Sequence, residues 1–412
     1  MRSEPVPRVP PVYAFGTLAL IALAAWILAR SLGNVPYEPK SDDGYYLVYA
    51  RRVSEEGPGV FPRLFTSWNE NSAYWIYPSP LRVFFVLVSG LWVKLFGATL
   101  PALSWLSITS HLAWIACTAW FARRHFEERR AFLITALASF AALLLGSARQ
   151  ALQDSFLLVL LALSVWTFLE TLRAPQSRGW RVSFIASFTL AILTKELAVL
   201  LGPAFALGVL VEWRANRSLP LRAFALQLVL PLVISAPVFV LAAGGVEPLL
   251  LTVRRVLSSP ATNTYATQFG AGPWYRYLID YLCLSPGVTL LALGFTGALL
   301  LRTLRGAYER TLVQLGIVAA VLLFELGFFT KNVRYLLVLE LCLCVFAATM
   351  LDELVPQKAR ARWLWIGAAG VLLCFLDWRT YDYGWVQHGI YDPLSALLFQ
   401  LRDILPATEP VK

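Results

Sequence analysis

The chain has 412 residues, of which 58% are hydrophobic and only 15% are charged, and its formal net charge is +10. Soluble globular proteins average roughly 45–50% apolar and about 25% charged residues, so this composition indicates a polytopic membrane protein. The positive charge does not point to a nucleic-acid partner, because the arginines fall in short clusters between apolar runs, as they do in cytoplasmic loops.

The cysteines and histidines do not form a metal-binding motif. No C-x-x-C pair occurs, and His111, His125 and His388 lie far apart in the sequence. We therefore expect no metal or other cofactor, while a divalent cation is left open. We expect the cysteines to be small packing residues of the apolar runs. They are Cys117, Cys283, Cys342, Cys344 and Cys374.

Apolar runs long enough to cross a bilayer, which takes about 20 residues, follow one another along most of the chain. The first run has no small-residue cleavage site after it, so we expect a retained anchor rather than a removed signal peptide. The eleven predicted spans are 12–32, 101–121, 131–148, 154–172, 182–194, 197–213, 222–242, 285–301, 311–329, 334–351 and 363–377.

A further apolar run, 79–97, decides the predicted topology. If it lies on the membrane surface and the N-terminus is cytoplasmic, every cytoplasmic segment carries several arginines or lysines. The positive-inside rule favours this arrangement, and Arg82 and Lys94 within the run suit a helix that lies in the interface. The short outer loops then hold only Arg149, Lys195, Lys331 and Arg334.

The predicted architecture is an all-α bundle of about eleven transmembrane helices, with the N-terminus cytoplasmic and the C-terminus outside. Residues 1–377 form the transmembrane domain, and 378–412 form a short outer-face tail that is expected to cap the site. Two larger outer loops occupy about 33–100 and 243–284, and the first is expected to contain interfacial helices. Its many aromatic residues suit a membrane-interface belt, and equally suit stacking on sugars or lipid tails.

Two adjacent carboxylates, Asp42 and Asp43, follow the first span and open a predicted helix at 43–56. Acidic residues are scarce, 25 in 412, so this pair at the edge of the membrane is the best pointer to chemistry in the sequence. Two carboxylates this close disfavour double ionisation, which raises the basicity of one of them. Each could instead serve the helix, as an N-cap or as a charge that complements the helix dipole.

Other ionisable residues gather on the same predicted outer face. This agreement is independent evidence, because the topology was predicted from the arginines and lysines of other loops. Asp154 opens the fourth span, where it could hold an arginine, orient an acceptor or cap the helix. Lys331 and Arg334, at spacing i and i+3, are expected on one face of the helix that opens the tenth span. Each cation could also extend towards lipid headgroups, and Lys195 could pair with Glu196 in a tight turn.

The order and spacing of these elements resemble the GT-C glycosyltransferases that use polyprenyl-phosphate sugars, above all the protein O-mannosyltransferases and the lipid A aminoarabinose transferases. The resemblance covers most of residues 12–351. Where the family has Pro-Pro, this chain has Pro78, Ser79 and Pro80, and it lacks the Glu-Lys that precedes this element in the lipid A enzymes. The matching elements are Asp42-Asp43, Tyr45-Tyr46, Ala50-Arg51, Lys94-Leu95-Phe96-Gly97, Asp154, Thr194-Lys195, Arg334-Tyr335 and the outer-loop segment 268–277.

The resemblance implies an inverting membrane glycosyltransferase that moves one sugar from a polyprenyl-phosphate donor to a lipid, glycan or protein acceptor. The reaction would take place on the outer face of the cytoplasmic membrane, with Asp42 as the base and Asp43 and Asp154 as assisting acids. The residues expected to bind the donor phosphate are Lys331, Arg334, Tyr335, Lys195, Arg276 and Arg255. The residues expected to line the substrate and lipid cavity are Tyr45, Tyr46, Tyr77, Arg149, Trp274 and Tyr275.

Three other functions fit the sequence less well than this one. A lipid-linked oligosaccharide ligase or polymerase also places cations against a polyprenyl phosphate, but fits the paired carboxylates less well. A transporter would carry ionisable residues near the middle of its spans, where Glu325 is the main candidate. A non-catalytic scaffold subunit would have no need of Asp42 and Asp154. The sugar and the acceptor are not specified by the sequence.

Overall fold

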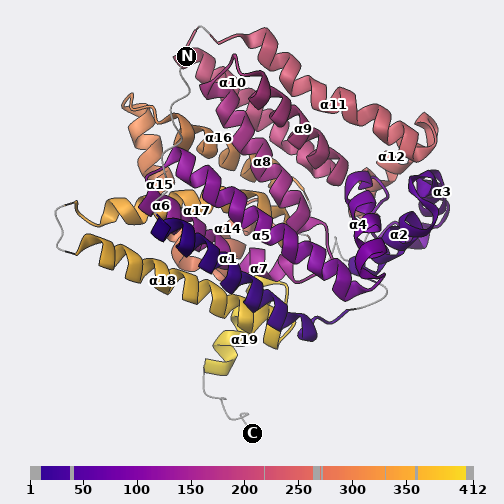
Figure 1. Ribbon diagram of the computed structural model, residues 1–412, viewed down its shortest axis with the longest axis horizontal. Coiled ribbons are helices and arrows are strands. Elements are labelled where there is room, and N and C mark those ends of the chain that lie inside the picture. Colours follow the sequence, from indigo (N-terminus) through magenta and orange to yellow (C-terminus); the bar gives the residue numbers. More distant parts are fainter. Residues whose placement is uncertain are drawn as a thin grey trace.

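The computed structural model describes residues 11–37, 41–217, 219–262, 270, 272–329, 331–357 and 361–404. Over these residues the chain is helical and contains no strand (Figure 1). The helices pack around one extended apolar core that includes Trp114, Phe168, Phe205 and Phe346. The prediction of an all-α fold is therefore confirmed.

Seven helical stretches of the described residues are long and apolar enough to cross a membrane, and a bent pair makes up to eight. The pair is α6 (Glu128–Phe140) and α7 (Ala142–Ala148), bent by 52°. The chain is thus a multi-pass membrane protein. The seven are α1 (Pro11–Ser31) with η1 (Leu32–Asn34), α5 (Leu100–His125), α8 (Asp154–Arg173), η4 (Glu196–Leu200) with α10 (Leu201–Ala215), α11 (Leu221–Ala243), α15 (Pro286–Leu304), and η5 (Val333–Leu339) with α17 (Glu340–Leu354).

The three other predicted spans coincide with helices that miss this test on length or composition. They are α9 (Arg178–Thr194) and α16 (Arg310–Leu326), each of 17 residues, and α18 (Arg362–Tyr381) of 20 residues. The number of eleven spans, and the side of the membrane on which each loop lies, stay predictions.

The loop after α1 folds into its own small group of helices at one side of the bundle (Figure 1). It comprises α2 (Asp42–Glu56), η2 (Pro58–Val60), α3 (Phe61–Glu70), η3 (Ser72–Tyr74) and α4 (Val83–Phe96). The 14 residues of α4 span only about 21 Å at 1.5 Å per residue, less than the roughly 30 Å hydrocarbon core of a bilayer. This length agrees with the prediction that 79–97 does not cross the membrane.

Close packing at a glycine fixes α2 against α4. A Cβ placed on Gly90 of α4 would lie 2.6 Å from Val53 of α2, so only glycine permits this approach. Since Asp42 opens α2, the same contact sets the position of the acidic pair relative to the bundle.

The later loop and the C-terminal segment also contain helices. They comprise α12 (Val246–Thr262), α14 (Arg276–Leu284), the π-helical turn η6 (Asp382–Gln387) and α19 (Pro393–Ile404). The described residues do not include 263–269, 271 and 405–412. Three positions of the predicted donor loop 268–277, namely 268, 269 and 271, therefore lie outside them. Helix α18 continues to Tyr381, four positions beyond the predicted end of the transmembrane domain at residue 377.

Candidate active site

Asp42 and Asp43 both lie in the first turn of α2, which begins one residue before the predicted 43–56. Ser41 is the N-cap, since its Oγ accepts a hydrogen bond from the Gly44 amide at 3.5 Å. Neither aspartate therefore serves as the cap, although both charges are favourable at this end of the helix dipole. The Asp42 side chain is 31% exposed, whereas Asp43 is buried.

Arg334 connects Asp42 with Asp154. Its Nη2 donates to Asp42 Oδ2 at 2.9 Å, and its Nη1 lies 3.5 Å from Asp154 Oδ2. Arg334 stands in the first turn of η5, where Asn332 Oδ1 accepts from the Arg334 amide at 3.0 Å and so begins the helix. One guanidinium thus joins the starts of α2, α8 and η5, three elements that lie far apart in the sequence.

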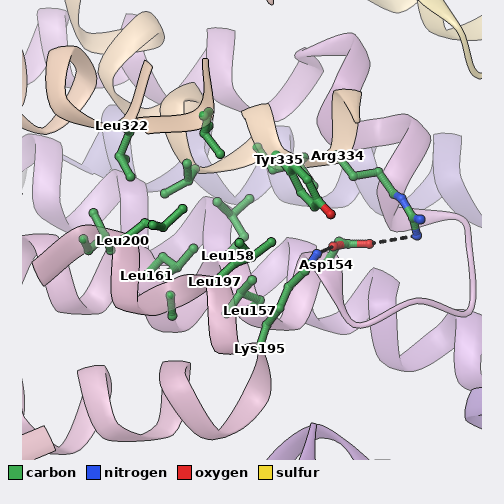
Figure 2. Close-up of a pocket in the computed structure, with 15 residues that line it drawn as sticks. Asp154, Leu157, Leu158, Leu161, Lys195, Leu197, Leu200, Leu322, Arg334 and Tyr335 are labelled. Carbon is green, nitrogen blue, oxygen red and sulfur yellow. Dashed lines mark hydrogen bonds and ion pairs between the residues drawn. The ribbon is translucent and has the colours of Figure 1, made fainter. Parts of the chain in front are cut away.

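Asp154 is held by a second cation, Lys195, as Figure 2 shows. Lys195 Nζ donates to Asp154 Oδ1 at 2.8 Å, and both side chains are almost wholly buried. Lys195 sits in the break between α9 and η4 and lies 5.2 Å from the centre of the Tyr335 ring. Lys195 thus pairs with Asp154, and not with its neighbour Glu196. Asp154 does not cap α8, because its carboxylate is used in these two ion pairs.

The pKa of Asp43 is raised from its ordinary value to about 7. Burial is the main cause, and the negative charges of Asp42 and Asp154 add to it, while Arg334 and a backbone hydrogen bond from Ala151 act in the opposite direction. Oδ1 of Asp43 has no hydrogen-bond partner within the described part of the chain. A carboxyl group in this state can hold or release a proton near neutral pH.

The acidic pair opens into a polar cavity of about 290 Å³. The start of α2, the end of α7, the start of α14 and the residues before η5 form its walls, and the C-terminal segment closes it. The cavity is lined by Ser41, Asp42, Asp43, Leu143, Ser147, Gln150, Leu152, Arg276, Asp280, Lys331, Asn332, Val333, Arg334, Trp385, Tyr391, Asp392 and Pro393.

Lys331 lines this cavity but is not on a helix with Arg334, because η5 begins only at Val333. The expected pairing on one helical face is therefore not observed. Its Nζ donates to the carbonyls of Gly327 at 2.5 Å and Phe329 at 2.9 Å, which satisfies the end of α16.

Arg276, at the start of α14, faces the same cavity between two aspartates. Its Nη2 donates to Asp392 Oδ1 at 3.2 Å, and its Nε lies 3.8 Å from Asp280 Oδ1. Burial, with the charge of Asp392 adding to it, raises the pKa of Asp280 to about 6, although Arg276 lowers it. Nothing in the sequence analysis pointed to Asp280, Tyr391 or Asp392, because they join the site only through packing of α14 and the C-terminal segment.

On its other side the site opens into an apolar pocket of about 50 Å³. Figure 2 shows leucines of α8, η4 and α16 along this pocket, with Asp154, Lys195, Arg334 and Tyr335 at one end. Charged groups at one end and aliphatic side chains along the rest suit a molecule with a charged head and a hydrocarbon tail. The leucines are Leu157, Leu158, Leu161, Leu197, Leu200, Leu201, Leu322, Leu326 and Leu337.

Arg82 and Gln153 were not predicted as site residues, but their hydrogen bonds connect the segments that carry the site. Arg82 Nη1 donates to the buried Tyr46 hydroxyl. With the Gln153 amide oriented to satisfy both ends, it accepts from Arg82 Nε and donates to the Thr194 carbonyl, each at 3.1 Å. This network connects α2 with Gln153 and Thr194, the residues that directly precede Asp154 and Lys195. The position of Gln153 next to Asp154 was the only sequence signal.

The structure places the remaining predicted residues outside the lining of these two cavities. Tyr45 stacks on Tyr77 with ring centres 3.8 Å apart, on the partly exposed side of α2. Arg149 is wholly buried, and its guanidinium donates to the carbonyls of Ser31, at 3.1 Å, and Trp385. Arg149 therefore holds the C-terminal segment against the end of α1.

Arg255, Trp274 and Tyr275 also lie apart from the ion-pair cluster. Arg255 Nη1 donates to Asn69 Oδ1 at 3.4 Å and lies 4.3 Å from the centre of the Trp75 ring, so it joins α12 to the first loop. Trp274 and Tyr275 are 74% and 48% exposed and contact each other edge to face.

The bundle of membrane helices has the GT-C fold, which the comparisons with known proteins show. Residues 80–241 match the family model described as dolichyl-phosphate-mannose-protein mannosyltransferase. No curated protein gives a significant sequence match.

Two kinds of solved structure are similar to this chain over nearly its whole length. ArnT from Cupriavidus metallidurans bound to undecaprenyl phosphate has 17% sequence identity and a TM-score of 0.56, with 93% of this chain and 74% of ArnT covered. The oligosaccharyltransferase of Archaeoglobus fulgidus has 12% identity and a TM-score of 0.61. That comparison covers 90% of this chain and 53% of the archaeal protein, so the chain spans about half of its length.

Proposed function

We propose that this chain is an inverting membrane glycosyltransferase. It transfers one sugar from a polyprenyl-phosphate donor to an acceptor hydroxyl on the outer face of the cytoplasmic membrane. One observation carries the proposal: the guanidinium of Arg334 lies between Asp42 and Asp154, where a polar cavity meets an apolar pocket. The GT-C fold and the match of residues 80–241 to a mannosyltransferase family model support it.

The donor phosphate binds at Lys195 and Arg334, and the prenyl chain follows the leucine-lined pocket. These two cations stand at the polar end of that pocket, and arginine forms strong bidentate hydrogen bonds to phosphate oxygens. The similar ArnT structure holds undecaprenyl phosphate, which supports a donor of this class. Lys331 and Arg276 face the polar cavity, where they are placed to meet the sugar or the acceptor rather than the prenyl chain.

The reaction is a single displacement. The acceptor oxygen forms a bond to the anomeric carbon while the bond from that carbon to the phosphate oxygen breaks, which inverts the configuration. Asp42 removes the proton from the acceptor hydroxyl, because it is the more exposed carboxylate of the pair and faces the polar cavity. The released phosphate is stabilised by Lys195 and Arg334.

Asp43 and Asp154 assist Asp42 in different ways. Asp154 holds Arg334 and Lys195 at a defined separation, since it contacts both cations. Asp43, with its pKa near 7, keeps a proton beside Asp42 for part of the time and so limits the repulsion between the two carboxylates.

The experiment is incubation of the purified full chain with a panel of radiolabelled polyprenyl-phosphate sugars and membrane-extracted acceptors. Transfer of a single labelled sugar by the wild-type chain, with transfer slowed by about 10²-fold or more in Asp42→Asn, supports the proposal. Transfer of an oligosaccharide chain instead would make the chain a lipid-linked oligosaccharide ligase or polymerase. Normal transfer by Asp42→Asn would remove the base assignment while leaving the enzyme class intact.

A further inference from the structure

A second cavity is lined by residues of α1, α6 and α18 and is separate from the carboxylate site. It has a volume of about 840 Å³, within the range of roughly 300–1,000 Å³ that is usual for ligand sites. Its walls are almost entirely apolar. The lining includes Leu20, Ile27, Phe132, Phe140, Gly367 and Val371.

The three helices that form this groove run in the same direction. The Tyr13 ring of α1 lies 6.2 Å from the Phe132 ring near the start of α6. At their other ends, the Tyr381 hydroxyl of α18 donates to Ser31 Oγ at 2.7 Å. In Figure 1, α1 and α18 accordingly have similar slants across the bundle. The groove therefore runs along the helix axes, a direction that an extended lipid tail can follow.

Glycines allow the close helix packing around the groove and leave one part of it unfilled. A Cβ on Gly16 of α1 would lie 2.8 Å from Phe132, and one on Gly370 of α18 would lie 2.7 Å from Leu133, so α1 and α18 both approach α6 closely. Gly367, one turn before Gly370, has no heavy atom within 4 Å of its Cβ position. The space over Gly367 is therefore empty of protein and belongs to the groove.

A polar cavity of about 1,000 Å³ adjoins the groove where the three helices begin. The two cavities share Tyr13, Arg129 and Trp363. Arg129 stacks on the Trp363 ring, 4.8 Å from its centre, and it forms no ion pair with an acidic side chain of the described residues. Its guanidinium is thus free to bind an anion at the mouth of the groove.

The polar cavity contains further charged side chains besides Arg129. Arg130 and Arg362 both pair with Asp352, at 2.5 Å each, so these three side chains satisfy one another. Glu127 and Glu128 line the cavity without an ion pair in the described part of the chain. From the groove outwards, the order is therefore an apolar channel, an available guanidinium and then two available carboxylates.

We propose that this site binds one aminophospholipid, of the phosphatidylethanolamine class. An acyl chain fills the groove over Gly367, the phosphate binds Arg129 beside Tyr13 and Trp363, and the ammonium faces Glu127 and Glu128. An anionic glycerol headgroup matches the channel and the arginine but meets two unpaired carboxylates, so phosphatidylglycerol binds less well. The proposal does not depend on transferase activity, since the groove mouth lies at the opposite end of α1 from Asp42.

The test uses the purified full chain in micelles with equal amounts of dioleoyl phosphatidylethanolamine and dioleoyl phosphatidylglycerol, with bound lipids counted by native mass spectrometry. We expect one phosphatidylethanolamine to remain in preference to phosphatidylglycerol. Gly367→Leu should remove it, because the leucine occupies the groove. The matched control is Gly297→Leu in α15, another helical glycine with no atom within 4 Å, which should retain the lipid.

Two further variants test the headgroup, and neither depends on filling the core. Arg129→Gln, at an exposed position, should weaken phosphatidylethanolamine binding about tenfold. Glu127→Gln with Glu128→Gln should abolish the preference over phosphatidylglycerol. Equal retention of the two lipids by the wild-type chain, or an unchanged lipid count in both Gly367→Leu and Arg129→Gln, would overturn the proposal. Displacement of the phospholipid by added undecaprenyl phosphate would also overturn it, by making the groove a second donor site.

Discussion

Arg334 donates to Asp42 at 2.9 Å although 292 positions separate the two residues in the sequence. The same guanidinium lies 3.5 Å from Asp154, which also binds Lys195. The two cations and the two carboxylates therefore form one connected cluster. Removal of each member has a different expected consequence, because the members differ in burial and in the number of their partners.

Asp42→Asn should reduce sugar transfer by about 10²–10⁴-fold, since the variant loses its general base. Thermal stability and membrane insertion should change little, because the Asp42 side chain is partly exposed. Transfer rates and melting temperature measured on the same preparation check both statements. Glu55→Gln, an exposed acid on the same helix, is the control and should behave as wild type.

Asp43 should make the stability of the protein fall as pH rises between about 4 and 7. Its folded-state pKa of about 7 lies above the ordinary value of 3.8, so the folded chain binds the proton more tightly than the unfolded chain in this window. Asp43→Asn should flatten this part of the pH profile and should be at least as stable as wild type at pH 8. Melting temperatures of both proteins from pH 4 to pH 8 decide the matter, and parallel profiles would contradict the burial of an ionising Asp43.

Arg334→Ala should weaken donor binding more than folding. Hydrogen bonds to a charged group contribute about 1.5–3 kcal/mol, so we expect the donor KM to rise roughly ten- to hundredfold. Asp154 keeps its contact with Lys195 in this variant, which limits the loss of stability. Initial rates as a function of donor concentration give the answer, and an unchanged donor KM would remove Arg334 from the phosphate site.

Lys195→Met should destabilise the protein by about 3–5 kcal/mol, because it leaves the buried Asp154 carboxylate without its closest cation. Replacing the partner as well, in Lys195→Met with Asp154→Leu, should restore much of this loss, since no charge is then left unpaired. Denaturation of the two variants and of Asp154→Leu forms a double-mutant cycle. A coupling energy near zero would show that the pair is not formed.

Metal chelation should leave sugar transfer unchanged, because the proposed leaving phosphate is met by Lys195 and Arg334. The described residues contain no group of three or more His, Cys, Asp or Glu side chains placed to hold a metal ion. Transfer rates with and without EDTA, each followed by added Mg²⁺ or Mn²⁺, test the expectation. Loss of activity that a divalent cation restores would require a metal beside the donor phosphate.

Most of the secondary structure was predictable from the sequence, including the helix that begins beside Asp42 and the break at Lys195. Both features depend on local properties, namely the length of apolar runs and the residues that interrupt them. The surface character expected of 79–97 also agrees with a helix too short to cross a bilayer. Lys331 was placed incorrectly on the helix of Arg334, because the Asn332 cap begins η5 only after it.

The roles of individual cations were much less predictable. Arg149 and Arg334 carry the same charge and each lies at the outer end of a predicted span, yet Arg149 holds two backbone carbonyls whereas Arg334 joins two carboxylates. Arg82 had the sequence context of an interfacial residue and instead supports Tyr46 and Gln153. No local pattern distinguishes these cases.

By itself the sequence determined that this protein is a helical membrane protein with an acidic pair at the edge of its first span, since hydrophobic length and composition are properties of contiguous residues. Only the tertiary structure decided that Asp42 and Asp154 share Arg334, that Asp43 is buried beside them, and that an apolar pocket and a polar cavity meet at this point. The physical reason is that the partner and the solvent exposure of a charge depend on which helix ends pack together, and these ends come from opposite parts of the chain.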